Sequence, residues 1–349
     1  MSLASYLHAA PKAELHVHLE GSILPATLLE LARRNDVSLP ADTVEGLRDW
    51  FSYRDFSHFI EIYVAITRCL RTAQDYEDIV YEFGATMARQ HVRYAEVTFS
   101  PSTHDALGVP YEVYFSGLTR GRERAERDFG VVIRWVFDLV RGLRDPARAA
   151  RFAAYTTDVA IASKDVGVVS LGLGGLEAGN PPEPFAAYFE RALTAGLHSD
   201  PHAGETAGPE SIWGAIHVLH AERLGHGVRA IEDPELVTYL AERRIPLEVN
   251  PTSNLRLGVY PDLAAHPLRR LHDAGVIVTV NSDDPPLFNT TLNDEMSLLA
   301  DPFGFEVAAC DEILLNGVRS AFLPADRKAA LEAEFRSDLD ALKLEHLQG

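Results

Sequence analysis

Short apolar runs rich in β-branched residues alternate along the chain with longer amphipathic segments rich in Ala, Leu and Arg. This alternation is typical of strand–helix units that assemble into a parallel sheet. Eight apolar runs predict strands, at residues 13–19, 92–99, 131–139, 166–173, 197–203, 222–227, 246–250 and 276–282. Eight strands, each followed by a helix-length segment, are the number that closes a barrel. The pattern therefore predicts an α/β fold of the (β/α)8 TIM-barrel class.

A long insertion separates the first predicted strand from the second, at residues 20–91. Its stretch WFSYRDFSHFIEIYVAITRCL, residues 50–70, carries aromatic side chains at helical spacing. Such a stripe is typical of a helix that packs in the core, and it also fits a lid over the barrel mouth. The tail after Asp311 alternates charged residues with Leu and Ala, which predicts a closing helix.

Composition narrows the class of protein. The chain has 349 residues, of which 46% are hydrophobic, and no linker interrupts the strand–helix rhythm, so we expect one domain over residues 1–349. A net charge of −19 disfavours nucleic acid and anionic membranes as partners. Cys69 and Cys310 stand far apart, which suits a reducing compartment. We find no targeting segment and no uncharged run of the roughly 18 residues that span a bilayer, so we expect a cytoplasmic protein.

Histidine and acidic residues gather where the predicted strands end, which is where barrel enzymes carry their active sites. His16 and His18 are two apart on the first strand, so both side chains point to one face. Two imidazoles that converge there suit Zn²⁺, although an HxH pair alone is a weak indication. His202 and Glu205 follow the fifth strand, and His226 ends the sixth between two glycines.

The eighth strand ends in Asp283 and Asp284, and burying two adjacent carboxylates is costly unless a cation or a proton compensates. Each of these features also has a structural explanation, such as a satisfied histidine or an Asp-rich turn. Together they predict one zinc ion held by three histidines and an aspartate. The fourth strand offers no lysine that could be carbamylated to bridge a second ion, because Lys164 precedes it. The same ligands would accept Fe²⁺ or Co²⁺.

At these residues the chain resembles the adenosine/adenine deaminase family of the amidohydrolase superfamily. The resemblance runs across nearly the whole length and is carried by PKAELHVHLEG, HAGETAGPESIWGAIHVLHAERLGHGV, NPTSN and NSDDPP. It implies an aminohydrolase that replaces the 6-amino group of an adenine nucleoside with oxygen and releases ammonia. It also implies that His16, His18, His202 and Asp283 hold the zinc ion, which lowers the pKa of the attacking water to about 7.

The resemblance further assigns the groups that surround the purine. Glu205 is expected to protonate N1. His226 is expected to orient the attacking water and to take or stabilise its proton. Asp284 is expected to bind N7, as donor or acceptor according to its protonation, and the backbone N–H of Gly175 to contact N3. The remaining substrate-binding candidates are His18, Glu20, Phe56 and Phe59, with Tyr63 as a further candidate wall of the lid.

Departures from the family pattern bear on the substrate. Glu20 stands where many adenosine deaminases carry Asp, Gly172 and Leu176 stand where acids are common, and Asn250 replaces a usual cysteine. Glu20 favours a free base or a 5′-modified nucleoside over plain adenosine, and Gly172 and Leu176 make the pocket roomier or more apolar. Asn250 is expected to change packing or hydrogen bonding with little effect on the chemistry. The combination of LGLGG, HLEG and NSDDPP is similar to family members thought to act on 6-aminodeoxyfutalosine, an adenine nucleoside with a bulky 5′ extension.

Several alternatives stay open at this point. A ring-opening cyclic amidohydrolase and a non-catalytic binding relative share the fold, although the intact ligand set and the HxxE acid favour deamination. The sequence leaves open whether the chain forms a homo-oligomer. Ser100 could line the pocket. We expect structural or solvent-facing roles for the other histidines, among them His58, His91, His198, His217 and His220.

Overall fold

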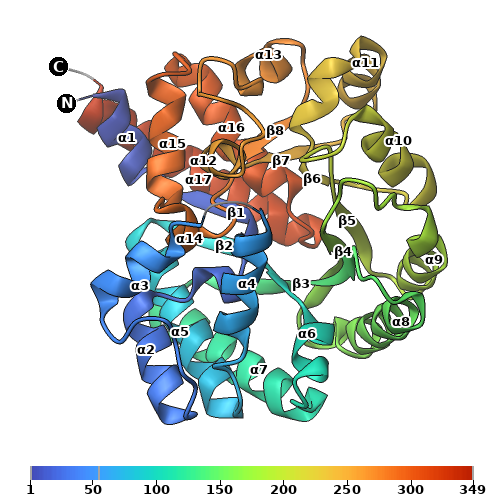
Figure 1. Cartoon of the computed structure of the whole chain (residues 1–349). Helices are drawn as coiled ribbons and strands as arrows, with labels where there is room; N and C mark the ends of the chain where they lie inside the picture. The colour runs from blue at the N-terminus through green and yellow to red at the C-terminus, as the bar shows by residue number, and fades with distance from the viewer. Residues whose placement is uncertain (1, 54–55, 348–349) are drawn as a thin grey trace.

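Eight parallel strands form the centre of the molecule (Figure 1). The structure is a computed structural model that describes residues 2–53 and 56–347, with only the backbone described for 56 and 57. The strands lie in sequence order, and each predicted strand is present to within a residue or two at either end. They are β1 Lys12–His18, β2 Val92–Phe99, β3 Val132–Arg141, β4 Val168–Gly175, β5 His198–Ala203, β6 Leu224–His226, β7 Leu247–Val249 and β8 Val278–Val280.

The barrel closes where the chain following β8 meets β1. The His18 N–H donates to the Asp283 carbonyl at 2.9 Å, and the Asp283 N–H donates to the His16 carbonyl at 3.1 Å. This contact brings two residues of the first strand directly against the end of the last one. Closure therefore places the ELHVHLEG and NSDDPP segments side by side at one rim.

Helices surround the strands, as Figure 1 shows. Those between β1 and β2 form the predicted helical insertion, and they are η1 Glu20–Ser22, α2 Pro25–Arg34, α3 Val44–Phe51, α4 Phe56–Thr67 and α5 Ala73–Arg89. The others up to β8 are α1 Leu3–Ala9, α6 Pro101–Ala106, α7 Tyr111–Phe129, α8 Pro146–Ala162, η2 Lys164–Val166, η3 Glu183–Phe185, α9 Ala186–Thr194, α10 Pro209–Val218, η4 Val228–Glu232, α11 Pro234–Arg243, α12 Pro251–Arg256 and α13 Leu268–Asp273.

After β8 come α14 Pro285–Phe288, α15 Leu292–Ala300, α16 Val307–Ser320 and α17 Ala325–His346. The expectation of one closing helix in the tail was wrong, because two helices are present. The break falls at Ala321, whose backbone is extended, shortly before Pro324. Proline has no N–H to donate and disfavours helical geometry in the residue before it, so it separates the helices. Among the described residues, no helix is both long and apolar enough to cross a membrane.

Many polar and charged side chains are buried on the barrel strands, and one cluster of them surrounds a single arginine. The guanidinium of Arg223 is fully buried and lies 2.6 Å from Glu96, 2.7 Å from Asp200 and 2.6 Å from Glu248. A buried charge is tolerated only when it is paired in this way. This cluster lies directly beneath the rim that carries the predicted site, because Glu248 also contacts His16.

Candidate active site

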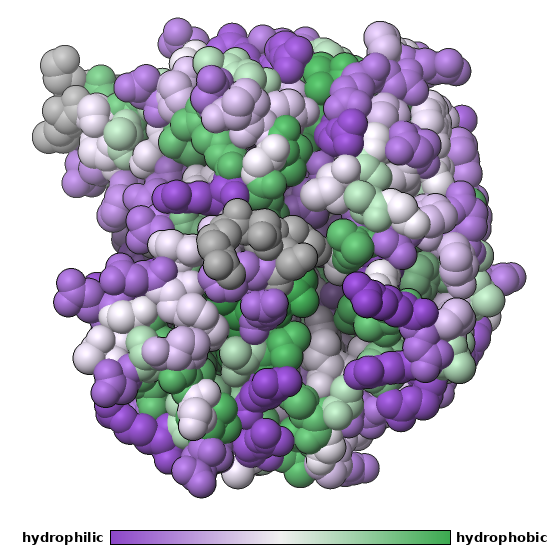
Figure 2. Space-filling model, in the orientation of Figure 1, coloured by the Kyte–Doolittle hydropathy of each residue, from purple (hydrophilic) through white to green (hydrophobic). Residues whose placement is uncertain are grey.

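A cavity of about 390 Å³ opens at the carboxyl ends of the strands. Its walls include His18, His202, Glu205, His226 and the Asp283–Asp284 pair. Figure 2 shows a hollow near the middle of the face, bordered by hydrophobic residues in the region of α4 and α6. The structure therefore brings the predicted chemistry into one enclosed space.

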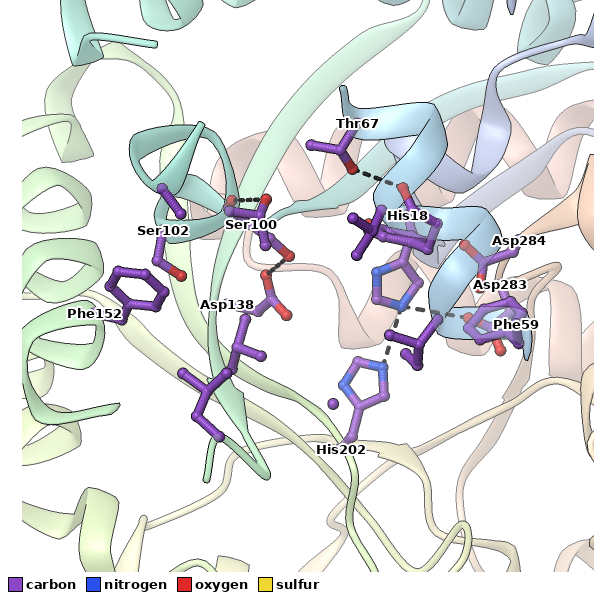
Figure 3. A pocket seen from close by; sticks show the side chains of 18 of the residues that line it. His18, Phe59, Thr67, Ser100, Ser102, Asp138, Phe152, His202, Asp283 and Asp284 are labelled. Carbon is purple, nitrogen blue, oxygen red and sulfur yellow. Dashed lines mark hydrogen bonds and ion pairs between the residues drawn. The ribbon is translucent and has the colours of Figure 1, made fainter. Parts of the chain in front are cut away.

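His18, His202 and Asp283 converge at one end of this cavity (Figure 3), and His16 lies within metal-ligand distance of them. His18 Nε2 lies 3.2 Å from His202 Nε2 and 3.4 Å from Asp283 Oδ1, and His16 Nε2 lies 3.7 Å from the same oxygen. Ligands about 2.05 Å from a tetrahedral zinc ion are about 3.3 Å apart, which these separations approach. Burial and the neighbouring imidazoles lower the pKa of His202 well below its usual value, so this ring is neutral, as a ligand must be. The four side chains fit a zinc ion.

Glu248, on strand β7, fixes the orientation of the His16 ring. Its Nδ1 donates to Glu248 Oε2 at 2.9 Å, while its buried Nε2 has no hydrogen-bond partner among the described residues. A carboxylate behind a histidine is the usual support of a metal ligand, since it leaves the other nitrogen facing the ion. Although burial acts in the opposite direction, Asp283 and Glu248 raise the pKa of His16 well above its usual value, so a metal must displace a proton from this ring.

Glu205 is held over the cavity by a second carboxylate, Glu177. The Glu177 side chain accepts from the backbone N–H groups of residues 204–207 at 2.6 to 3.0 Å and from Ser211 Oγ at 2.6 Å. These bonds fix the loop that follows β5. Burial, followed by the charges of Asp283 and Glu177, raises the pKa of Glu205 to about 8, so it holds a proton at neutral pH.

A chain of hydrogen bonds determines which nitrogen of His226 carries a proton. The Leu268 N–H donates to His266 Nδ1 at 3.2 Å, so the proton of this ring is on Nε2, which donates to Asn254 Oδ1 at 3.1 Å. The Asn254 amide then donates to His226 Nδ1 at 3.1 Å, as does Asn250 at 3.3 Å. Burial lowers the pKa of His226 to about 3, so the ring is neutral and presents Nε2–H to the cavity.

Asp284 faces the cavity from the end of the barrel beside Asp283. Burial and the neighbouring Asp283 raise its pKa well above its usual value, and its buried Oδ1 has no partner among the residues that the structure describes. The Asp284 side chain can take this position only because residue 21 is glycine: a Cβ at Gly21 would lie 1.6 Å from Asp284 Oδ1. Gly175 also lines the cavity, at the end of β4 with φ +91°, a conformation that favours glycine.

Helix α4 forms one wall. Phe59 and Tyr63 line the cavity, and Phe59 also stacks on Phe288 with ring centres 5.7 Å apart, so it serves both the wall and the core. The side chain of Phe56, a predicted wall residue, lies outside the described residues. Glu20 is fully buried behind the wall, where it accepts from Tyr63 Oη at 3.1 Å and contacts His104 Nε2 at 2.9 Å. A direct contact of Glu20 with substrate therefore stays a prediction.

Sequence reasoning missed the residues that hold the site in place. Glu177, Glu248 and Asn254 contact site residues without lining the cavity, and His266 supports Asn254. Asp138 lines the cavity with an oxygen 2.6 Å from Ser100 Oγ. Glu248 and Asp138 had a visible signal, since each is a lone carboxylate inside an apolar strand, where an unpaired charge is costly. Ser100 does line the cavity, whereas five other histidines are not among its lining residues: His58, His91, His198, His217 and His220.

A parallel eight-stranded barrel with a His/Asp cluster at the carboxyl ends of its strands defines an enzyme of the amidohydrolase type. The family model described as adenosine deaminase matches residues 11–337, and the chain belongs to this family.

Its relatives share nearly the whole chain. The aminodeoxyfutalosine deaminase of Streptomyces coelicolor is 44% identical over 335 residues, which are 95% of this chain and 85% of that protein. The crystal structure of adenine deaminase from Arthrobacter aurescens has a TM-score of 0.88 and 34% identity, covering 94% of this chain and 99% of that chain. An amidohydrolase from Burkholderia ambifaria, solved with bound Zn, has a TM-score of 0.89 and 29% identity, covering 98% and 94%. The chain is a hydrolytic deaminase that acts on a C–N bond, and the names of its relatives imply a purine substrate.

Proposed function

We propose that this chain is a zinc-dependent deaminase of an adenine nucleoside, which converts the 6-amino group to a 6-oxo group. One observation carries the proposal. Three histidines and an aspartate, with ligand separations of 3.2 to 3.7 Å, lie at the same end of a cavity as Glu205, a carboxyl group that keeps its proton at neutral pH. A zinc ion bound by His16, His18, His202 and Asp283 would polarise the attacking water. We also propose that residues 1–349 form one domain.

Three side chains bind the purine and the attacking water and supply the protons. Glu205 donates its proton to N1 of the purine as the water oxygen adds to C6, so no full negative charge forms on the ring. His226 donates from Nε2–H and holds the attacking oxygen. It acts as a donor and not as the base, because two amide groups already donate to its Nδ1. Asp284, protonated, donates to N7. Of the two water protons, one passes to the amino group, which leaves as ammonia, and the other returns to the Glu205 carboxylate, so one water is consumed for each ammonia released.

The length of the cavity favours a nucleoside over free adenine. From the His/Asp cluster the cavity runs past Ser100 and Asp138 to Ser102 and Phe152, which Figure 3 shows on the side opposite the histidines. A free base at the metal end would leave that space empty. The similarity to the aminodeoxyfutalosine deaminase of Streptomyces coelicolor supports a nucleoside with a 5′ extension. Free adenine is the alternative, supported by the adenine deaminase fold match.

The test is ammonia release from adenine, adenosine, AMP and 6-aminodeoxyfutalosine. Glu205→Gln keeps the size of the side chain but cannot deliver the proton, so we expect kcat to fall about 100-fold or more. Glu210→Gln is the matched control, because Glu210 is exposed, lies in the first turn of α10 directly after the Glu205 loop and is absent from the cavity lining. Turnover of adenine alone would overturn the nucleoside assignment, and no ammonia from any of the four would overturn the deaminase proposal.

The metal is tested separately by elemental analysis of the purified protein. We expect one zinc ion per chain and loss of both zinc and activity with a chelator. His202→Asn should lower the zinc content in the absence of any substrate. Full zinc occupancy in this variant would contradict the ligand set.

A further inference from the structure

One buried carboxyl group in the cavity takes no part in the proposed chemistry. Asp138, on β3, lines the cavity and is only 3% exposed. Figure 3 shows it between the histidines of the metal end and the side chains of Ser102 and Phe152. A nucleoside whose purine lies at the metal end therefore carries its ribose past this carboxyl group.

The hydroxyl group of Ser100 turns toward the same carboxyl group. Ser100 precedes α6 at the position where a serine usually caps a helix, yet its side chain makes no capping bond to this helix, all of which is described. Instead, Ser100 Oγ donates to Asp138 Oδ1 at 2.6 Å, and both side chains line the cavity. The lone pairs of the Ser100 hydroxyl group are therefore left for a donor in the cavity.

The second oxygen of Asp138 lies in a space that two glycines of β4 leave open. Oδ2 makes no hydrogen bond with another residue in the described part of the chain, and a Cβ at Gly174 would lie 2.5 Å from it. Gly172 pairs with Asp138 in the register of β3 and β4, and a Cβ there would lie 3.2 Å from Asp138 Cβ. Gly174 precedes Gly175, the expected N3 contact, so Asp138 Oδ2 lies near the purine edge that adjoins the sugar.

Asp138 Oδ2 carries a proton that it can donate. Burial, opposed in part by the Ser100 hydroxyl group and reinforced by the charge of Glu20, raises the pKa of Asp138 to about 8, so its carboxyl group is uncharged at neutral pH. Because Oδ1 accepts from Ser100, the proton is on Oδ2. The two side chains together present one donor, Asp138 Oδ2–H, and one acceptor, Ser100 Oγ. A sugar hydroxyl group, which both accepts and donates, matches this pair.

We propose that Asp138 and Ser100 bind the 2′-hydroxyl group of the nucleoside, with Asp138 Oδ2–H donating to it and Ser100 Oγ accepting from it. The proposal rests on the proposed function, because it needs the purine at the His/Asp cluster. The 2′ position is the one that fits, because the 2′-hydroxyl group lies on the N3 side of a purine nucleoside in the anti conformation. Asp138 and Ser100 therefore make the enzyme select ribonucleosides over 2′-deoxyribonucleosides.

The test compares adenosine with 2′-deoxyadenosine, which differ by this one hydroxyl group. Ammonia release gives kcat/KM for each, and each is also measured as a competitive inhibitor of 6-aminodeoxyfutalosine deamination, so the comparison does not depend on fast turnover. We expect the wild type to prefer adenosine by about tenfold or more, mainly through KM, because 2′-deoxyadenosine leaves buried polar partners unpaired. 3′-Deoxyadenosine is the control substrate, since it lacks a hydroxyl group that Asp138 and Ser100 do not bind, and it should behave like adenosine.

Variants then locate the source of the preference. Asp138→Ala should abolish it by slowing adenosine and not 2′-deoxyadenosine. Ser100→Ala should lower it about threefold and should still fold, since the Ser100 hydroxyl group makes no capping bond to the described helix α6. Asp138→Asn should keep most of it, because the amide oxygen still accepts from Ser100 and the amide N–H₂ still donates. Asp75→Asn is the control, since Asp75 is also buried but does not line the cavity, and it should keep the wild-type preference.

The possible results separate this proposal from the proposed function. Equal values for adenosine and 2′-deoxyadenosine in the wild type would overturn the hydroxyl site, while ammonia release from any nucleoside leaves the proposed function standing. Equal losses for both nucleosides in Asp138→Ala would also overturn it, because Asp138 would then act on the base or on the fold. Loss of the preference in Asp138→Asn would overturn the role of Asp138 as a donor. No ammonia from any nucleoside, 6-aminodeoxyfutalosine included, would overturn the proposed function itself.

Discussion

Replacing Glu248 with glutamine should weaken zinc binding although Glu248 lies outside the cavity. The wild-type carboxylate accepts from His16 Nδ1 at 2.9 Å with one oxygen and contacts Arg223 Nε at 2.6 Å with the other. Glutamine has only one oxygen, and Arg223 will take it because a guanidinium can only donate. The amide N–H₂ then faces His16 Nδ1, which must become an acceptor. The proton moves to Nε2, the nitrogen that faces the metal site.

The expected magnitude follows from two opposed effects. Loss of a supporting carboxylate typically costs 10- to 100-fold in metal affinity, or about 1.4 to 2.7 kcal/mol. Glu248 also raises the pKa of His16, so its removal eases displacement of the ring proton by zinc. This compensation is strongest at low pH, where that proton competes most. We therefore expect a loss near tenfold at pH 6.5 and a larger loss at pH 8.5.

The assay is competition for zinc between the apoprotein and a chromophoric chelator at both pH values. Glu96→Gln is the matched control, because Glu96 contacts the same Arg223 guanidinium at 2.6 Å but has no contact with His16. Both variants should unfold at lower urea concentration, since each weakens a buried ion-pair network. Only Glu248→Gln should bind zinc more weakly. Equal zinc affinities for the two variants would refute the reasoning.

Three further predictions concern the cavity. Asn254→Asp should lower kcat about 100-fold with little change in KM, because a carboxylate accepts the ring proton at His226 Nδ1 more strongly than the 3.3 Å amide of Asn250 opposes this, so Nε2 loses its proton. Steady-state kinetics with kcat within threefold of wild type would contradict this. Phe59→Ala should raise KM, because Phe59 lines the cavity. It should also lower the free energy of unfolding by about 3 kcal/mol, because Phe59 is 8% exposed and its ring stacks on Phe288. Lower stability with an unchanged KM would mean that Phe59 serves the core alone. Burial raises the pKa of Asp138 from 3.8 to about 8, so its contribution to stability is complete below pH 4 and is lost as the pH rises through 8. The Tm of Asp138→Asn relative to wild type should therefore be higher at pH 8.5 than at pH 6, and a constant difference would show that the carboxyl titrates normally.

The barrel could be predicted from the sequence because its strands are buried on both faces. Such strands read as continuous apolar runs, and their ends are marked by the polar residues that carry the chemistry. His16 and His18 follow from strand geometry alone, since residues two apart share a face. Closure of the barrel is enough to bring His202 and Asp283 next to these two histidines. The backbone contact of His18 with Asp283 closes it.

The supporting contacts could not be predicted in the same way, because they join positions far apart in the sequence. Glu177 binds the loop at residues 204–207, and His266 acts on His226 through Asn254. No periodicity marks such pairs. A lone carboxylate in an apolar strand was the only local indication, and it identifies Glu248 and Asp138 as groups that need a partner without saying which one. The break between the two helices of the tail was not predicted, because Pro324 alone marks it within a sequence pattern that is otherwise helical.

The segment from β7 into α12 carries side chains that hold site residues in place without contacting the substrate. It supplies none of the predicted metal ligands, yet three of its side chains each hold a different site residue. Glu248 orients His16, Asn254 donates to His226, and Ser253 Oγ donates to Asp283 Oδ2 at 2.6 Å. Because each bond assigns a proton or a lone pair to a particular atom, a shift of this strand would alter the hydrogen-bonding state of the site before it altered its shape. We therefore infer that the register of β7 between β6 and β8 is a determinant of catalysis as well as of stability.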